Sequence, residues 1–177
     1  MKEGDSLSFE NNVTVTWKGY QEFTFPFETK TKIEITNLDV SIENHSSHSV
    51  KHHHWVDWPD RGVPPADLAA MHLLYTFQDI KTPVVIHCSA GIGRTGSMVL
   101  IEIAMETLQK GYALEEMPKY LVAVRSQRNN SIQNEQQYLF VHQVLLNFLH
   151  VAGWLPKSLE PHLQTFTEQY LKMTSGF

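Results

Sequence analysis

The segment from Val84 to Gly96 constrains the fold more than any other part of this sequence. It reads VVIHCSAGIGRTG, in which a short run of β-branched residues leads into small residues and glycines. An unbroken apolar run such as 84–86 is typical of a buried parallel strand. The apolar stretch from Gly96 to Lys110 predicts a helix, and Gly111 is the residue expected just past its end. We therefore expect a strand, a glycine-rich loop and a helix in direct succession.

The small residues of this loop predict a binding site for a phosphate group. They let the backbone curl so that successive N–H groups point inward, and the helix adds its positive N-terminus. In such a loop the Cys88 thiol is expected to titrate well below the ~8.5 of a free thiol. Arg94 can give a phosphate two parallel hydrogen bonds, which a lysine cannot. The expected phosphate-binding residues are Ser89, Ala90, Gly91, Ile92, Gly93 and Arg94.

Two less specific interpretations of this loop are a nucleotide site and tight packing of a strand on a helix. The loop has neither the Gly-Lys-Ser/Thr ending of a P-loop nor the glycine spacing of dinucleotide-binding folds. A lone cysteine is usually a small buried apolar residue. Cys88 is the only cysteine of the chain, which excludes an internal disulfide and a multi-cysteine zinc site. Its place before a glycine-rich loop and an arginine favours a nucleophile.

Charge and hydropathy bear on the partners and the compartment. A net charge of −5 argues against nucleic acid, although a local pocket of an acidic protein can still bind a phosphate. No apolar run approaches the roughly 20 residues of a membrane helix, and the polar start at 2–6 leads into no signal peptide. We expect an intracellular, cytoplasmic protein with no nucleic-acid and no membrane partner. The oligomeric state stays open.

Histidines at 45, 48 and 52–54 suggest a metal site at first sight. However, successive residues of a strand point to opposite faces, so residues 52–54 cannot all bind one ion. We expect no metal and no cofactor.

The regular elements divide the chain into a β-rich first third and a mixed remainder. Alternating residues predict strands at 13–17, 23–25 and 32–36, with a turn at 18–19. The polar stretch 37–49 predicts a loop, with the alternative that Val40 and Ile42 form part of a strand, and 52–56 predicts a further strand. A helix at 67–77 would carry Leu68, Met71, Leu74 and Tyr75 on one face. Further helices are predicted at 117–127, 134–149 and 158–173.

Three motifs follow one another along the chain. The acid-bearing segment WPDRGVP spans 58–64, HCSAGIGRTG spans 87–96, and QNEQQY spans 133–138, after arginines at 125 and 128. They resemble, in this order and spacing, the mobile acid loop, the active-site signature and the glutamine loop of the classical protein tyrosine phosphatases. The resemblance covers roughly 50–149. The signature alone would admit dual-specificity phosphatases, whereas the three motifs together favour the tyrosine-specific branch.

The resemblance implies a role for each matched residue. Cys88 would attack phosphorus and form a cysteinyl-phosphate while Arg94 holds the phosphate oxygens. Asp60 would protonate the leaving phenolate and then act as a base on water. Gln133 would orient that water, and Thr95 would help the sulfur to leave. The supporting residues are His87, Trp58, Pro59 and Gln137.

The resemblance also implies the fold, an α/β cysteine-phosphatase fold with a twisted mixed sheet flanked by helices. We expect a single domain over 1–177, with a β-rich part at 8–56, the acid loop at 57–65, the catalytic loop at 87–96 and C-terminal helices within 113–173. The family's domain extends further upstream and holds a substrate-recognition loop there, which implies that this domain is N-terminally incomplete. Either 52–56 then pairs with the strand at 84–86, or a sheet edge lies open.

Two functions remain open on these grounds. The first is hydrolysis of phosphotyrosine in proteins, which the intact Cys88, Arg94, Asp60 and Gln133 favour. The second is a catalytically impaired or inactive phosphatase-like remnant that binds phosphotyrosine or is an incomplete domain, which the missing upstream loop favours.

Overall fold

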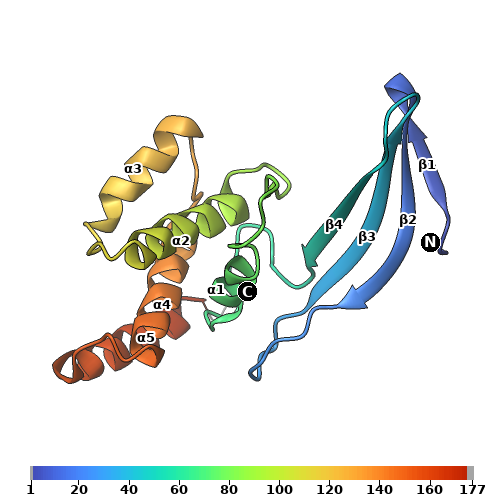
Figure 1. Ribbon diagram of the computed structural model, residues 1–177. Helices are drawn as coiled ribbons and strands as arrows, with labels where there is room; N and C mark the ends of the chain where they lie inside the picture. Colours follow the sequence, from blue (N-terminus) through green and yellow to red (C-terminus); the bar gives the residue numbers. More distant parts are fainter. Residues whose placement is uncertain (1, 175–177) are drawn as a thin grey trace. The chain divides into compact units, whose positions relative to one another are not determined.

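The computed structural model describes residues 2–174. The chain forms two compact units, one ending at Asp57 and the other beginning at Trp58. Among the described residues, the first unit holds all of the strands and the second holds all of the α-helices (Figure 1). The predicted α/β class is confirmed.

The first unit is an antiparallel sheet in which each strand pairs with the next one along the chain. Val15 pairs with both Leu7 and Val40, so alternate apolar side chains of neighbouring strands share one face. Ile33 and Ile35 are buried at the other end of the third strand. The strands are β1 (Ser6–Phe9), β2 (Val13–Glu22), β3 (Ile33–Ile42) and β4 (His48–Trp55), with a 3-10 turn, η1 (Glu10–Asn12), between the first two.

Several predicted strand boundaries are wrong. The expected turn at 18–19 is instead a β-bulge, because the register shifts between Trp17 and Gly19 while β2 continues. The expected strand at 23–25 belongs to the loop between β2 and β3. The polar stretch after residue 36 pairs on both sides, since Leu38 lies opposite Trp17 and Val50, and β3 therefore runs on to Ile42. Cross-strand pairing outweighed the polar composition of this stretch.

The second unit is built from α1 (Ala69–Tyr75), α2 (Gly93–Gln109), α3 (Met117–Gln127), α4 (Glu135–Val151) and α5 (Glu160–Thr174). A 3-10 turn, η2 (Lys157–Leu159), precedes α5. The centre of the unit is the packing of α2 on α4. Leu100 and Ile101 of α2 and Phe140 and Val144 of α4 are fully buried there. The predicted helices are confirmed, with small shifts at their ends.

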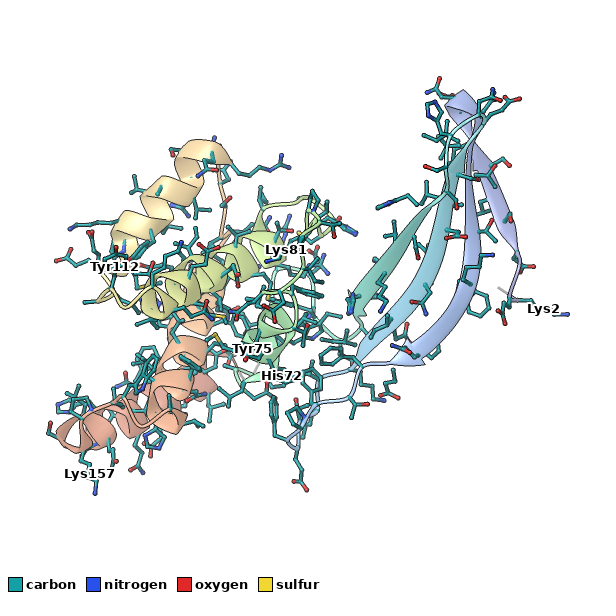
Figure 2. All side chains as sticks on the ribbon, viewed as in Figure 1. Lys2, His72, Tyr75, Lys81, Tyr112 and Lys157 are labelled. Atoms are coloured by element: carbon teal, nitrogen blue, oxygen red, sulfur yellow. The ribbon has the colours of Figure 1, made fainter. Side chains whose placement is uncertain are left out.

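One residue of the predicted apolar face of α1 points away from the core. Met71 and Leu74 are buried, but Tyr75, labelled in Figure 2, is 63% exposed at the end of the helix. The expectation for Tyr75 is wrong, because Tyr75 is the last residue of α1 and its side chain is exposed to solvent.

The predicted buried strand at 84–86 is also wrong. These residues form no strand, and Val84 and Val85 are 47% and 81% exposed. Among the described residues, β4 pairs with β3 through Trp55, and 84–86 belong to no strand pair. Of the two alternatives stated above, the described chain therefore agrees with the one in which 52–56 does not pair with 84–86. A strand forms only with at least one hydrogen-bonded neighbour, and the described strands supply none here.

Candidate active site

The catalytic loop bends tightly between residue 87 and the start of α2. Gly91 has a φ of +67°, a left-handed conformation that favours glycine. The backbone N–H groups of Gly91, Ile92 and Thr95 hydrogen-bond the Cys88 sulfur, which is partly exposed. Several donors therefore converge on one side chain, as predicted from the small residues of this loop.

These donors decide the ionisation of Cys88. Partial burial acts to raise the pKa of the thiol, but the hydrogen bonds from Thr95, Gly91 and Ile92 outweigh it and lower the pKa to about 7. The hydroxyl of Thr95 is buried and is one of the groups that act on the Cys88 sulfur. A thiol pKa lowered in this way favours the thiolate, the nucleophilic form of cysteine.

The acid loop meets the catalytic loop through Arg94. One guanidinium nitrogen of Arg94, Nη2, donates to Oδ1 of Asp60 at 3.3 Å, and Nη1 donates to the carbonyl of Trp58 at 3.3 Å. The Asp60 carboxylate is 70% exposed, so this ion pair is weak by itself. The ion pair matters because it shows that the side chains of Asp60 and Arg94, 34 positions apart in the sequence, lie next to each other.

Trp58 anchors the acid loop in the second unit. Its side chain is 6% exposed and packs edge-on against Phe140 of α4, with ring centroids 5.3 Å apart. Its Nε1 donates to the carbonyl of Gly62 at 3.3 Å. Both ends of the Trp58-to-Gly62 turn are therefore fixed, while Pro59 is half-buried and Asp60 faces solvent.

The glutamine segment lies against the first residue of α2. A Cβ added at Gly93 would lie 2.9 Å from Nε2 of Gln137 and closer still to Oε1 of Gln133, so both amides approach this glycine. Gln137 is fully buried, and its Oε1 accepts a hydrogen bond from the backbone N–H of Gln133 at 2.9 Å. Gln133 itself is exposed. Both predicted glutamines thus meet the catalytic loop.

Two arginines that carried no individual role in the sequence also hold this region together. Arg128 donates to the carbonyl of Ala90 in the catalytic loop at 3.2 Å. Arg125 donates to the carbonyls of Ser131 and Ile132, both at 2.9 Å. In the sequence, the only indication of this role is their position shortly before the glutamine segment. The tertiary structure shows which carbonyls they bind.

Gly96 is required for the contact between α2 and the segment before α4. A methyl group there would lie 2.8 Å from the backbone nitrogen of Ile132, which already donates to the carbonyl of Ile92 at 2.9 Å. Glycine to alanine inside a helix normally stabilises by about 0.5–1 kcal/mol. The clash reverses the sign, and we expect Gly96→Ala to lower the free energy of unfolding by roughly 1–3 kcal/mol. Urea unfolding measures it, and an equal or higher stability of the variant would contradict this packing.

His87, the remaining predicted site residue, is exposed at the start of the catalytic loop. The histidines at 45, 48 and 52–54 lie in the first unit. There His52 and His54 stack with ring centroids 6.0 Å apart, and His54 lies 3.8 Å from Glu34. Within residues 2–174, no group of three or more His, Cys, Asp or Glu side chains is arranged to hold a metal ion.

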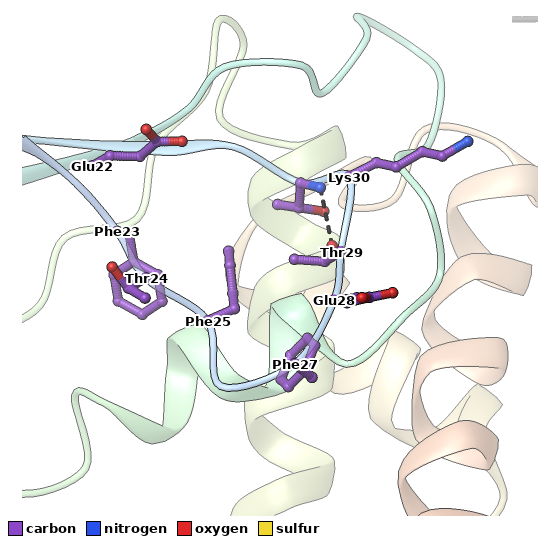
Figure 3. A pocket seen from close by; sticks show the side chains of 9 residues that line it. Glu22, Phe23, Thr24, Phe25, Phe27, Glu28, Thr29 and Lys30 are labelled. Carbon is purple, nitrogen blue, oxygen red and sulfur yellow. Dashed lines mark hydrogen bonds between the residues drawn. The ribbon is translucent and has the colours of Figure 1, made fainter.

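A hollow in the first unit contains none of the predicted site residues. It is formed by the loop between β2 and β3, and Figure 3 shows the side chains that line it. Phe23, Phe25 and Phe27 are in ring contact along this loop. Because none of the predicted site residues lines this hollow, we do not assign it to the candidate active site.

Most of the chain is similar in sequence to known proteins. Residues 2–147 match the family described as "Protein-tyrosine phosphatase". The chain is 37% identical over 105 residues to rat tyrosine-protein phosphatase non-receptor type 20, covering 58% of this chain and 25% of that protein. It is 35% identical over 130 residues to human receptor-type tyrosine-protein phosphatase zeta, covering 71% of this chain and 6% of that one.

The fold agrees with this. The crystal structure of a protein tyrosine phosphatase from Trypanosoma brucei superposes with a TM-score of 0.71 at 27% identity, over 82% of this chain and 52% of that chain. The chain thus spans about half of that solved chain, and a quarter or less of the two curated relatives. Relatives of both the receptor and the non-receptor type match, and no helix in residues 2–174 has the length and hydropathy to cross a membrane. The chain belongs to the protein-tyrosine phosphatase family.

Proposed function

We propose that this chain is a hydrolase that removes phosphate from phosphotyrosine in proteins through a cysteinyl-phosphate intermediate. The observation that carries the proposal is the set of N–H groups that converge on Cys88 and lower its pKa to about 7. These donors stabilise a thiolate, and the same loop is suited to hold the equatorial oxygens of a phosphoryl group. We assign phosphate binding to the backbone of 89–93 and to the guanidinium of Arg94.

In the first step, the Cys88 sulfur attacks phosphorus and the bond from phosphorus to the tyrosyl oxygen breaks. A phenolate is a poor leaving group, so Asp60 donates a proton to that oxygen as it departs. The 3.3 Å contact between Asp60 and Arg94 supports this role, because it places the acid beside the residue assigned to the phosphate. The products are a tyrosine side chain and a phosphate bound to sulfur.

In the second step, water attacks the phosphorus and the sulfur–phosphorus bond breaks. Asp60, now ionised, takes the proton from the water, and the Thr95 hydroxyl stabilises the departing thiolate. We assign the orientation of the water to Gln133, supported by Gln137, on the ground that both amides lie against Gly93. His87, Trp58 and Pro59 are assigned supporting positions. No step of this mechanism uses a metal or a cofactor.

We further propose that the two units act as parts of a single phosphatase domain and that the substrate is a phosphotyrosine-containing protein. The mechanism needs a reduced sulfur, which favours the cytoplasm as the compartment in which this site works. The test is release of inorganic phosphate from a phosphotyrosyl peptide by the whole chain, with the phosphoseryl peptide of the same sequence for comparison. Turnover of the first and not the second is the expected result. Equal rates on both would contradict the tyrosine preference.

The reactivity of Cys88 tests the electrostatics separately from turnover. We expect the rate of alkylation by iodoacetamide to rise with pH around a midpoint near the thiol pKa of about 7. Thr95→Ala removes a donor to the thiolate and should move the midpoint upward by roughly one pH unit. Thr95→Ser keeps the hydroxyl and is the matched control. A midpoint unchanged in Thr95→Ala would show that this hydroxyl does not act on the sulfur.

A second candidate function is a phosphotyrosine-binding remnant with little turnover. One observation favours it: in the segment at 84–86, directly before the catalytic loop, Val84 and Val85 are exposed and no described strand pairs with the segment. The catalytic loop is followed by α2 but is preceded by no strand. A loop held by a regular element at one end only can bind an anion yet position it poorly for reaction. Saturable binding of the phosphotyrosyl peptide without phosphate release would establish this alternative.

A further inference from the structure

The side chain of Asn134 joins the acid loop to the start of α4. Its Oδ1 accepts a hydrogen bond from the backbone N–H of Gln137 at 2.9 Å, which makes Asn134 the N-cap of this helix. Its Nδ2 donates to the carbonyl of Arg61 at 2.7 Å. Asp60, the residue to which we assign the proton transfer, directly precedes Arg61.

The two partners settle the orientation of the Asn134 amide. A backbone N–H needs an acceptor and a carbonyl needs a donor, so oxygen must face Gln137 and nitrogen must face Arg61. Only an amide of this length meets both requirements. Serine keeps the cap but has no second polar atom, and aspartate keeps the cap but offers the Arg61 carbonyl no proton.

The backbone of Arg61 gives an independent reason for this contact. Its φ is +59°, a left-handed conformation that costs a non-glycine residue free energy. Such a conformation persists where surrounding contacts hold it in place. The hydrogen bond from Asn134 acts on the carbonyl of this same residue, one position after the proposed acid.

Arg94 also binds the acid loop, since it donates to the carbonyl of Trp58 and to Asp60. Arg94 is also the residue assigned to the phosphate, so a bound substrate competes for these donors. Asn134 carries no such second task. It can therefore keep the acid loop in place after Arg94 has turned to the phosphate.

From these contacts we propose that Asn134 is a positioning residue, which holds Asp60 over the catalytic loop through the carbonyl of Arg61. The inference rests on the proposed function, since it deepens the role given there to Asp60. It concerns the first step, in which the leaving oxygen needs a proton.

The test compares leaving groups. In Asn134→Asp and Asn134→Ser the cap remains and the bond to Arg61 is lost. We expect kcat for phenyl phosphate, whose strongly basic leaving group needs the acid, to fall by about threefold to tenfold, as for the loss of one hydrogen bond. The kcat for p-nitrophenyl phosphate, whose leaving group needs little protonation, should change much less. A general loss of folded protein would lower both rates equally, and equal losses would overturn the proposal.

A second measurement does not depend on turnover. Hydrogen exchange of the backbone amides of 58–63 should be faster in both variants than in the unchanged chain, while the first turn of α4 exchanges at the same rate because its cap is kept. Should the unchanged chain show no hydrolysis, faster exchange at 58–63 would still support the contact, and the proposed function alone would fail. Unchanged exchange at 58–63 would overturn the role of Asn134, whatever the activity.

Discussion

Cys88→Ser is expected to abolish phosphate release from a phosphotyrosyl peptide, with kcat falling by more than about a thousandfold. The physical reason is ionisation. The N–H groups of Gly91, Ile92 and Thr95 lower the thiol pKa to about 7, so the sulfur is available as an anion at neutral pH. A serine hydroxyl in the same position stays protonated, and no neighbouring base is assigned to remove its proton.

The experiment separates chemistry from binding. Serine is close to cysteine in size, so Cys88→Ser should still bind the phosphotyrosyl peptide, which calorimetry measures directly. Brief reaction of the unchanged chain with labelled substrate, followed by acid quenching, should leave label on Cys88 and none on the serine variant. Equal turnover by both proteins would end the assignment of Cys88 as the nucleophile.

Asp60→Asn is expected to lower kcat for phenyl phosphate by about a hundredfold to ten-thousandfold, the usual contribution of a general acid. Asparagine keeps an oxygen that can accept the hydrogen bond from Arg94, now made at 3.3 Å to Oδ1 of Asp60. It has no proton that it can transfer. The acid loop should therefore remain in place while the proton donor is lost.

The size of the loss should depend on the leaving group. With p-nitrophenyl phosphate the first step needs little protonation, so the fall in kcat should be much smaller. Asp79→Asn is a suitable control, because Asp79 is an exposed aspartate after α1 and outside the three motifs. Its rates should match those of the unchanged chain. A loss in Asp60→Asn that is the same for both substrates would contradict a role in proton transfer.

Most of the catalytic loop could be predicted from local sequence. The spacing of Cys88 and Arg94, the small residues between them and the helix that follows lie within one short stretch, and their geometry depends on near neighbours. The convergence of N–H groups on the sulfur agrees with that prediction. The helices could be predicted for the same reason, since their period and end residues are local features.

The strands were predicted less well, because a strand is completed by a partner elsewhere in the chain. The stretch at 84–86 has the composition of a buried strand, yet the described chain offers it no strand neighbour, and Val84 and Val85 stay exposed. The stretch after residue 36 has the composition of a loop, yet β2 and β4 pair with it on either side. Composition alone decided neither case.

The sequence alone indicated the candidate groups for chemistry: a thiol that loop N–H groups can ionise, an arginine suited to a phosphate, and an aspartate on a separate loop. The tertiary structure decided that these groups meet, through Arg94 to Asp60, the two glutamines to Gly93, and Asn134 to Arg61. The physical reason is the sequence separation between the residues in contact. Hydrogen bonds within a few residues follow from covalent geometry, whereas a contact between residues tens of positions apart depends on how α2 and α4 pack.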